Sequence, residues 1–318
     1  DEIHQLGIQT YDKFMLTTDG SAAGFYEQGV IDNMIRIAIE KGVPIIDAYN
    51  MATINVARYY NIEYLHGNIA TGRIANINFL SHETNPTPVS VLAKGKWVKR
   101  DGKNLSDDLY RSLDWEEFEL EPLELEWELT VDDLQFSMPF GITMENAVIT
   151  KPYSISIDVS NDTITNSKDE CFFMLVDRNG KWRINTLIKG FAEDLSGLAS
   201  SFSHTGDIIL IGKSKSDMLR AFKRMKEMRG GIVIVENGEI AKEISLPLKG
   251  IMSNKKIEDL IVEEKSFVAY LREKGYRFED PIHSLLFFST THLPYIRITP
   301  QGMYDVMNKM VLFPTIMR

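Results

Sequence analysis

The hydrophobic pattern of the first 60 residues predicts one short strand and two helices. The run Phe-Met-Leu-Thr-Thr-Asp at positions 14–19 is typical of a strand that ends in a carboxylate, Asp19. Apolar residues then recur at helical spacing from Val30 to Lys41, and Gly42 is a natural stop. Pro44 opens a second helix that extends to about Tyr60. Because α/β barrels place their chemistry at the C-terminal ends of strands, Asp19 is a candidate site residue.

Shorter strand patterns and glycine turns follow, and from Phe136 onward they are typical of an α+β domain. Residues 89–102 have the strand–Lys-Gly–strand form of a hairpin, and Asn-Gly pairs at 179–180 and 237–238 predict two more. The tail after Met303 has the pattern of a short helix and a final apolar segment. The other expected strands and helices span residues 153–159, 171–177, 182–188, 208–211, 215–228, 232–235, 239–244 and 257–274.

Composition indicates a globular protein of the cytosol. The chain has 318 residues, of which 44% are apolar, enough for one large core or two smaller ones. No apolar run reaches the roughly 20 residues that cross a bilayer, and the first residues lack a signal-peptide pattern. The single cysteine, Cys171, excludes an intramolecular disulfide and a cysteine metal cluster. Its apolar neighbours in the sequence predict a buried, unreactive thiol.

The net charge of −10 arises from one segment of the chain. Residues 106–133 contain 12 Asp or Glu against one Arg, and apolar residues alternate with glutamates between Phe118 and Leu129. The favoured interpretation is a linker that turns into strands with one solvated acidic face, and the alternative is an acidic docking strip. Nucleic-acid binding is disfavoured, because no basic stripe interleaved with aromatic residues is present.

Three elements of the first 80 residues resemble the end of an amidohydrolase-superfamily enzyme. That superfamily has a metal-ligating Asp after its last barrel strand, in the position of Asp19. An Ala-Thr-x-Asn-x-Ala element follows, here at 52–57, and then an element that returns the chain to a small β-sandwich, here at 67–77. The chain departs from the usual pattern at Gly20 and Asn76, where the superfamily has Asp.

The rest of the chain resembles the C-terminal domain of adenine deaminases. Gly190-Phe191-Ala192 is similar to a Gly-Phe-Gly element of that family. The run from Ser203 to Gly212 is similar to a Ser-His-Asp-Ser-His-Asn segment, of which it keeps His204 but not the second histidine. Further motifs of the family follow in the same order, at residues 230–238, 246–253, 280–281 and 298–306.

The resemblance implies three parts with α/β and α+β folds. Residues 1–64 are expected to be the last β/α unit of a metal-dependent (β/α)8 barrel, followed by a β-sandwich segment at 65–112. Residues 113–318 are expected to be the adenine-deaminase-type α+β domain. A closed barrel takes about 200 residues or more, so most of the barrel is expected to lie outside this chain.

The reaction that the resemblance implies is hydrolysis of adenine to hypoxanthine and ammonia. A bound divalent metal ion supplies the nucleophile by lowering the pKa of water to about 7, and manganese or iron is favoured over zinc. In this family the Asp after the last strand binds metal and shuttles the proton, which would give Asp19 both roles. The alternative is an Asp that caps the following turn. His204 is expected to reach the active site or a second metal, or only to hydrogen-bond the backbone.

Asp19 cannot hold a catalytic metal ion alone, because such an ion normally takes at least three protein ligands. No two histidines of the chain are separated by a single residue, so the other ligands are expected from earlier barrel strands. The expected partners are therefore a purine base and an N-terminal barrel segment. No association with a membrane is expected, and homo-oligomerisation stays open. The six histidines are His4, His66, His82, His204, His283 and His292.

Two classes of function stay open. In the first, the parent is an adenine-deaminase-like metallohydrolase, and this chain is its C-terminal part and inactive alone. In the second, the chain is a non-catalytic module for binding or assembly. Gly20 and the missing motif histidine favour this second class or an altered substrate, whereas the collinear motifs back to the strand before Asp19 favour the first. A parent with another substrate is a third alternative. The apolar face of the helix at 30–42 also predicts that residues 1–62 are loosely held and protease-sensitive when the chain is expressed alone.

Overall fold

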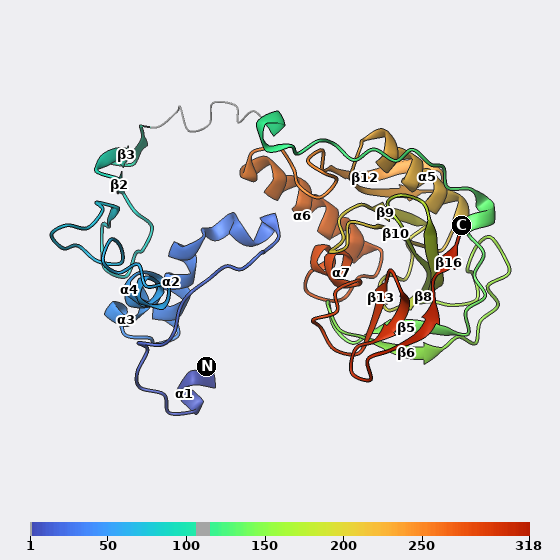
Figure 1. Cartoon of the computed structure of the whole chain (residues 1–318), viewed down its shortest axis with the longest axis horizontal. Coiled ribbons are helices and arrows are strands. Elements are labelled where there is room, and N and C mark those ends of the chain that lie inside the picture. The colour runs from blue at the N-terminus through green and yellow to red at the C-terminus, as the bar shows by residue number, and fades with distance from the viewer. Residues whose placement is uncertain (1, 106–114) are drawn as a thin grey trace. The chain divides into compact units, whose positions relative to one another are not determined.

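The computed structural model describes residues 2–105 and 115–318, and the chain divides into two compact units (Figure 1). Unit 1 spans residues 1–113, and unit 2 spans residues 114–318. Both combine helices with antiparallel strands, which confirms the mixed α/β class. The division of unit 1 at residue 64 and the assignment of its parts to a barrel and a β-sandwich stay predictions. No described helix is both long enough and apolar enough to span a bilayer.

Unit 1 begins with short helices whose apolar sides form a small core. The helix predicted at 30–41 is α2, and its Ile35 and Ala38 pack with Ala48 of α3. The second predicted helix is divided at Thr53, whose φ of −132° is not helical and whose hydroxyl donates to the Tyr49 carbonyl at 2.7 Å. The helices are α1 (Glu2–Gln5), the 3-10 helix η1 (Ala23–Gln28), α2 (Ile31–Glu40), α3 (Ile45–Ala52) and α4 (Ile54–Tyr59).

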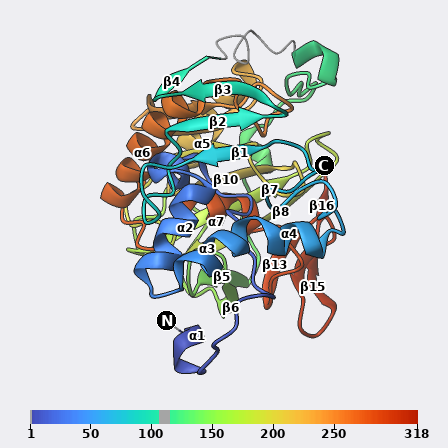
Figure 2. The same ribbon diagram turned by 90° about the vertical axis from the view of Figure 1, so that its left-hand side faces the viewer.

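A four-stranded antiparallel sheet completes unit 1 (Figure 2). Its strands follow the chain order, and the second and third form the predicted Lys-Gly hairpin. Lys94 and Gly95 have φ values of 48° and 78°, as a two-residue hairpin turn that follows the twist of its strands requires. The strands are β1 (Ile77–Phe79), β2 (Ser90–Ala93), β3 (Lys96–Arg100) and β4 (Lys103–Asn104).

The strand predicted at residues 14–19 is absent, and this prediction was wrong. The segment has no regular secondary structure. One backbone hydrogen bond connects it to α3, from the Leu16 N–H to the Met51 carbonyl at 3.0 Å. A strand exists only where a neighbour completes its hydrogen-bond ladder, and an apolar sequence pattern does not supply one. Among the described residues, no strand of unit 1 lies beside this segment.

A nine-stranded sheet forms the centre of unit 2, and it confirms both predicted Asn-Gly hairpins. Its order is β12-β11-β9-β10-β7-β8-β5-β6, with β16 beside β8, and β5 and β8 are its parallel pair. Asn237 and Gly238 have φ values of 51° and 81°, which suit a tight turn. The strands are β5 (Phe140–Met144), β6 (Thr150–Ser154), β7 (Glu170–Val176), β8 (Trp182–Lys189), β9 (Gly197–Ser200), β10 (Ile208–Gly212), β11 (Gly231–Glu236), β12 (Glu239–Ser245) and β16 (Ile316–Met317).

Helices cover both faces of the central strands (Figure 1). Every residue of β7 is buried, because alternate side chains pack against different layers. Phe172 belongs to the cluster that includes Phe222 of α5, whereas the Phe173 ring lies 5.2 Å from that of Phe288, directly after α7. The helices are α5 (Lys215–Glu227), α6 (Ile257–Glu273) and α7 (Pro281–Phe287).

The tail is a small sheet and not the predicted helix. Residues after Met303 continue β14, turn at Lys309 with a φ of 53°, and return as β15. The pattern was misleading because a short apolar run does not distinguish a helix from a buried strand. This sheet contains β13 (Ile296–Thr299), β14 (Gly302–Asp305) and β15 (Met310–Pro314).

The acidic segment is only partly described, since residues 106–114 lie outside the described residues. From Trp115 it forms the 3-10 helices η3 (Trp115–Phe118) and η4 (Val131–Asp133), and the strands predicted here are absent. The alternation nevertheless sorts side chains, because Leu123, Leu125 and Leu129 are buried while the glutamates between them are exposed. Several of these acidic side chains form ion pairs with basic side chains. The Glu128 carboxylate, for example, lies 2.5 Å from the Lys226 Nζ of α5.

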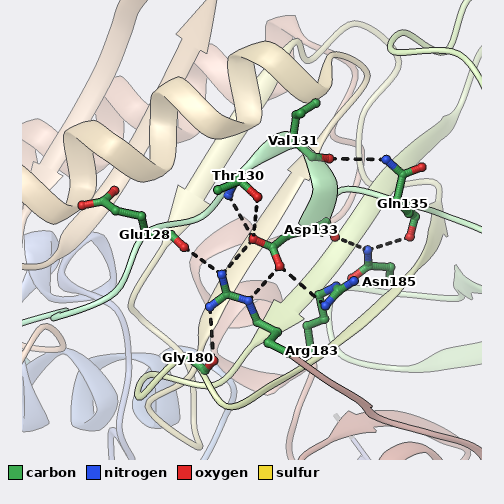
Figure 3. Close-up of polar contacts among 9 residues, drawn as sticks. Glu128, Thr130, Val131, Asp133, Gln135, Gly180, Arg183 and Asn185 are labelled. Atoms are coloured by element: carbon green, nitrogen blue, oxygen red, sulfur yellow. Dashed lines mark hydrogen bonds and ion pairs between the residues drawn. The ribbon is translucent and has the colours of Figure 1, made fainter.

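Asp133 of this segment lies among polar groups from several parts of unit 2 (Figure 3). Its two carboxylate oxygens each accept a hydrogen bond of 2.8 Å from the Arg318 guanidinium, which also donates to the carbonyls of Glu128 and Gly180. Burial raises the pKa of Asp133, but hydrogen bonds from Arg318 and Thr130 outweigh it, so that the pKa lies below its usual value. The ionised carboxylate therefore stabilises the folded state.

Candidate functional site

Asp19 lies in a segment of unit 1 that a buried asparagine holds in place. The Asn55 side-chain amide donates to the carbonyls of Tyr11 and Phe14, at 2.9 and 3.0 Å. Asn55 is the asparagine of the Ala-Thr-x-Asn-x-Ala element, so the structure gives that residue a positioning role that the sequence did not indicate. These two hydrogen bonds hold the backbone at Tyr11 and Phe14, the latter five residues before Asp19.

Asp19 itself is exposed and sits in a tight local turn. Its φ is 53°, its N–H donates to the Thr17 hydroxyl at 3.0 Å, and its Oδ1 accepts the Gly20 N–H at 2.8 Å. Its carbonyl also accepts the Tyr26 hydroxyl at 3.3 Å. The carboxylate thus caps the local turn, which is the alternative role that the sequence allowed. Its role as a metal ligand and proton shuttle stays a prediction.

The replacement of the usual second Asp by Gly20 is not forced by packing. A side-chain carbon built on Gly20 meets no atom within 4 Å, and its φ does not lie in the left-handed region. A larger residue would therefore fit at this position without strain. The departure changes the chemistry near Asp19 and not the local fold.

The described residues do not form a metal centre around Asp19. Among them, no three His, Cys, Asp or Glu side chains gather as metal ligands. One exposed carboxylate is too few donors for a catalytic ion, which normally needs three protein ligands. The donor set of the described chain therefore does not fit such an ion, and any remaining ligands would come from other residues.

A largely apolar cavity of 630 Å³ lies elsewhere in unit 1, between the helices and the sheet. Asp32 is a polar residue of its wall, and its carboxylate accepts hydrogen bonds of 2.8 Å from the Val30 N–H and the Thr87 hydroxyl. Burial raises the pKa of Asp32, yet these hydrogen bonds leave it below its usual value. Asp32 is therefore an ionised group that ties α2 to the sheet region, and Asp19 does not line this cavity.

His204, the second candidate, is exposed on the connection between β9 and β10. Its backbone N–H donates to the Leu286 carbonyl of α7 at 3.0 Å. Its ring lies edge-on to the ring of His292, with 6.4 Å between the ring centroids. Sequence patterns could not pair these two histidines, because 88 positions separate them.

Unit 2 also has an open cleft of 820 Å³ beside the start of α7. Asp280 lies here, and its carboxylate accepts the Ile282 and His283 N–H groups and contacts the His283 Nδ1 at 2.8 Å. Burial raises the pKa of Asp280, but the His283 side chain and these N–H groups bring it below its usual value. The Asp280-Pro281 motif of the sequence is therefore the N-terminal cap of α7.

Cys171 is fully buried in β7, as the sequence predicted. Its thiol lies 3.6 Å from the Ala192 carbonyl, and burial raises its pKa to about 12. The thiol is therefore protonated at neutral pH and is not a nucleophile.

Two family models match successive parts of the chain. The amidohydrolase family matches residues 2–99, and the adenine deaminase C-terminal domain matches residues 147–310. The second match covers just over half of the chain and contains the strands of unit 2 from β6 to β14. The chain belongs to the adenine deaminase family. The resemblance found in the motifs is thereby confirmed.

Several bacterial relatives, all provisionally named adenine deaminases, match the chain from end to end. The chain is 56% identical over 317 residues to one from Halalkalibacterium halodurans, covering 100% of the chain and 54% of the relative. It is 54% identical to one from Bacillus cereus, covering 99% and 53%. It is 51% identical to one from Bacillus subtilis, covering 100% and 54%. The chain spans about half the length of the curated relatives it matches.

Proposed function

We propose that this chain is part of a metal-dependent deaminase that hydrolyses adenine to hypoxanthine and ammonia. The observation that carries the proposal is the end-to-end identity of 51 to 56% with relatives named for that activity. The order of the two family matches, amidohydrolase before adenine deaminase C-terminal domain, also supports it. In this reaction the bond between the ring carbon and the exocyclic nitrogen breaks. The oxygen of water takes the place of that nitrogen on the ring carbon, and the nitrogen leaves as ammonia.

Within this proposal unit 1 contributes Asp19 and the end of a (β/α)8 barrel, followed by the β-sandwich segment. Asp19 would be one ligand of a divalent ion, manganese or iron, and would move the proton from water to the purine. The exposed position of its carboxylate and the Asn55 hydrogen bonds that fix its segment support this role. The other ligands would belong to a barrel segment outside this chain, which is the proposed partner of unit 1.

His204 of unit 2 is proposed to lie on the substrate side of the site. Its exposure and the backbone hydrogen bond that holds it to α7 support a fixed, accessible imidazole. The cytoplasm is the proposed location, in keeping with a purine substrate.

The test is ammonia release from adenine by the full-length protein with added manganese or iron. Asp19→Ala is expected to lower turnover at least about a hundredfold, since positioned proton transfer contributes 10² or more. Its melting temperature is expected to stay unchanged, because the side chain is exposed. Asp12→Ala is the matched control, since Asp12 is another exposed carboxylate of unit 1.

Each other outcome has a distinct meaning. Undiminished turnover of Asp19→Ala would remove the role assigned to that residue. Ammonia release from another heterocycle but not from adenine would replace the substrate. A full-length protein that deaminates no purine would favour the binding or assembly module.

A further inference from the structure

Two exposed histidines from distant segments of unit 2 lie together at the C-terminal end of α7. We propose that His204 and His292 form a binding site for a divalent transition-metal ion of the zinc, nickel or copper type. Their ring centroids are 6.4 Å apart with the planes at 65°. Imidazole nitrogens are preferred ligands of these ions, whereas magnesium, calcium and manganese prefer oxygen. The proposal does not rest on the deaminase activity.

The backbone that carries His204 is fixed. The His204 N–H donates to the Leu286 carbonyl of α7 at 3.0 Å. On either side, Ser203 and Asp207 are buried, and the Ser203 hydroxyl donates to the Asp207 carbonyl at 2.7 Å. Because both flanks are anchored, only the imidazole side chain is left to rotate.

The segment that carries His292 is fixed by a buried arginine. Arg297 is fully buried, and its guanidinium donates to the Phe287 carbonyl at 3.4 Å and to the Pro294 carbonyl at 3.0 Å. These two carbonyls stand on either side of His292 in the sequence. The Phe287 ring also lies edge-on to the His292 ring, at 5.8 Å. Arg297 and Phe287 thus hold the His292 segment against the same helix end that holds His204.

The spacing of the rings suits chelation after a small side-chain rotation. With zinc–nitrogen bonds of about 2.1 Å, two imidazole centroids in a tetrahedral site lie roughly 5 Å apart. The two ring centroids lie 6.4 Å apart, so the rings must approach each other by roughly 1 Å to bind one ion. Exposed side chains make such a movement by rotating about χ1 and χ2. Two ligands on a rigid frame bind more tightly than either alone, because the second bond forms within the same molecule.

The site offers two protein ligands and leaves the other positions to water. Among the described residues, no third His, Cys, Asp or Glu completes a metal cluster. The nearby His283 has its Nδ1 against Asp280 and stacks on Phe287, which is also in contact with the His292 ring. An ion held in this way keeps exchangeable positions, so it is a binding site with room for a further ligand and not a closed structural site.

The experiment is titration calorimetry of the 318-residue chain with Zn²⁺ at about pH 7.5. One site is expected, and either His204→Ala or His292→Ala is expected to weaken it at least about tenfold. His82→Ala is the matched control, because His82 is an exposed histidine of unit 1. The Asp19→Ala variant tests whether Zn²⁺ binds instead at Asp19, the other candidate metal ligand of the chain. Both controls are expected to keep the affinity of the unchanged chain.

A second readout separates chelation from a loss of structure. The Cu²⁺ electron paramagnetic resonance spectrum is expected to show two coordinated nitrogens, and one in either variant. The proposal is overturned if neither variant weakens Zn²⁺ binding while both keep the melting temperature of the unchanged chain. Equal weakening by His82→Ala would overturn it as well.

Discussion

Unit 2 buries its apolar side chains far more completely than unit 1. All seven residues of β7 are buried, and its side chains pack against α5 on one face and the end of α7 on the other. In unit 1 the buried cluster consists of Ile35, Ala38 and Ala48 with partly buried neighbours. Large side chains elsewhere in that unit are exposed, among them Ile46 at 71% and Ile69 at 80%.

This difference shows how the two units depend on their surroundings. A domain is stable by itself when the apolar area it buries offsets the conformational entropy lost on folding. Unit 2 has a layered core of that kind, whereas the buried cluster of unit 1 is small. Unit 2 is therefore expected to behave as a domain, and unit 1 as a part of one.

Limited proteolysis of the 318-residue chain should show the largest contrast. Cleavage within residues 1–62 is expected to be at least about a hundredfold faster than cleavage within unit 2, because local opening of a small core costs far less free energy. Mass spectrometry of the products should give a resistant fragment that contains β5 to β16. Digestion of unit 2 before residues 1–62 would reverse the comparison.

Substitution of Asp133 tests whether its ion pair with Arg318 contributes to the stability of unit 2. Asp133→Asn is expected to lower the free energy of unfolding by about 2 kcal/mol, the usual effect for hydrogen bonds to a charged group. The pKa of Asp133 is lowered in the folded state, so its contribution is present above the unfolded value, near 3.9, and lost as pH falls through the folded pKa. Urea unfolding at neutral and acidic pH measures both effects.

The neighbouring Asp132 provides the control, since it is exposed beside Asp133. Asp132→Asn should leave the free energy of unfolding unchanged within about 0.5 kcal/mol. An equal loss in both variants would point to general charge repulsion and not to the Arg318 pair.

Asn55 is expected to give the most local effect, which is confined to unit 1. Asn55→Ala removes the donors to the Tyr11 and Phe14 carbonyls and should cost about 1 to 3 kcal/mol locally. Hydrogen exchange should then quicken around Asp19, with no change in β7 or β10. Asn78→Ala, at an exposed position of β1, is the matched control. Slower exchange around Asp19 in the Asn55 variant would contradict its positioning role.

Local signals were enough to predict much of unit 2. Asn-Gly pairs define hairpin turns by their backbone preferences alone, and a helical period such as that of α6 needs no distant partner. The predictions failed where a distant neighbour decides the structure. Residues 14–19 lack a strand beside them, and the alternating leucines from Leu123 to Leu129 pack beside α5 without joining the sheet.

The candidate sites show the same limit. Family motifs identified Asp19 and His204 as single residues, and the structure shows which groups surround them. The roles of Asn55 and His292 depend on contacts across 41 and 88 positions, which no spacing rule can supply. Composition did predict the buried thiol of Cys171, because an apolar run in a strand is buried whatever its neighbours are.

The pairing of β16 with β8 has a consequence for how the chain folds during synthesis. Ile316 pairs with Arg183, 133 positions earlier in the chain. At the usual pace of translation, β8 emerges roughly 7 to 27 seconds before its partner. During that interval β7 is the one neighbour of the first half of β8 among the described strands, and the Asp133 carboxylate lacks its Arg318 guanidinium. The growing chain therefore carries an open sheet edge, which a chaperone or a neighbouring nascent chain can reach before β16 closes it.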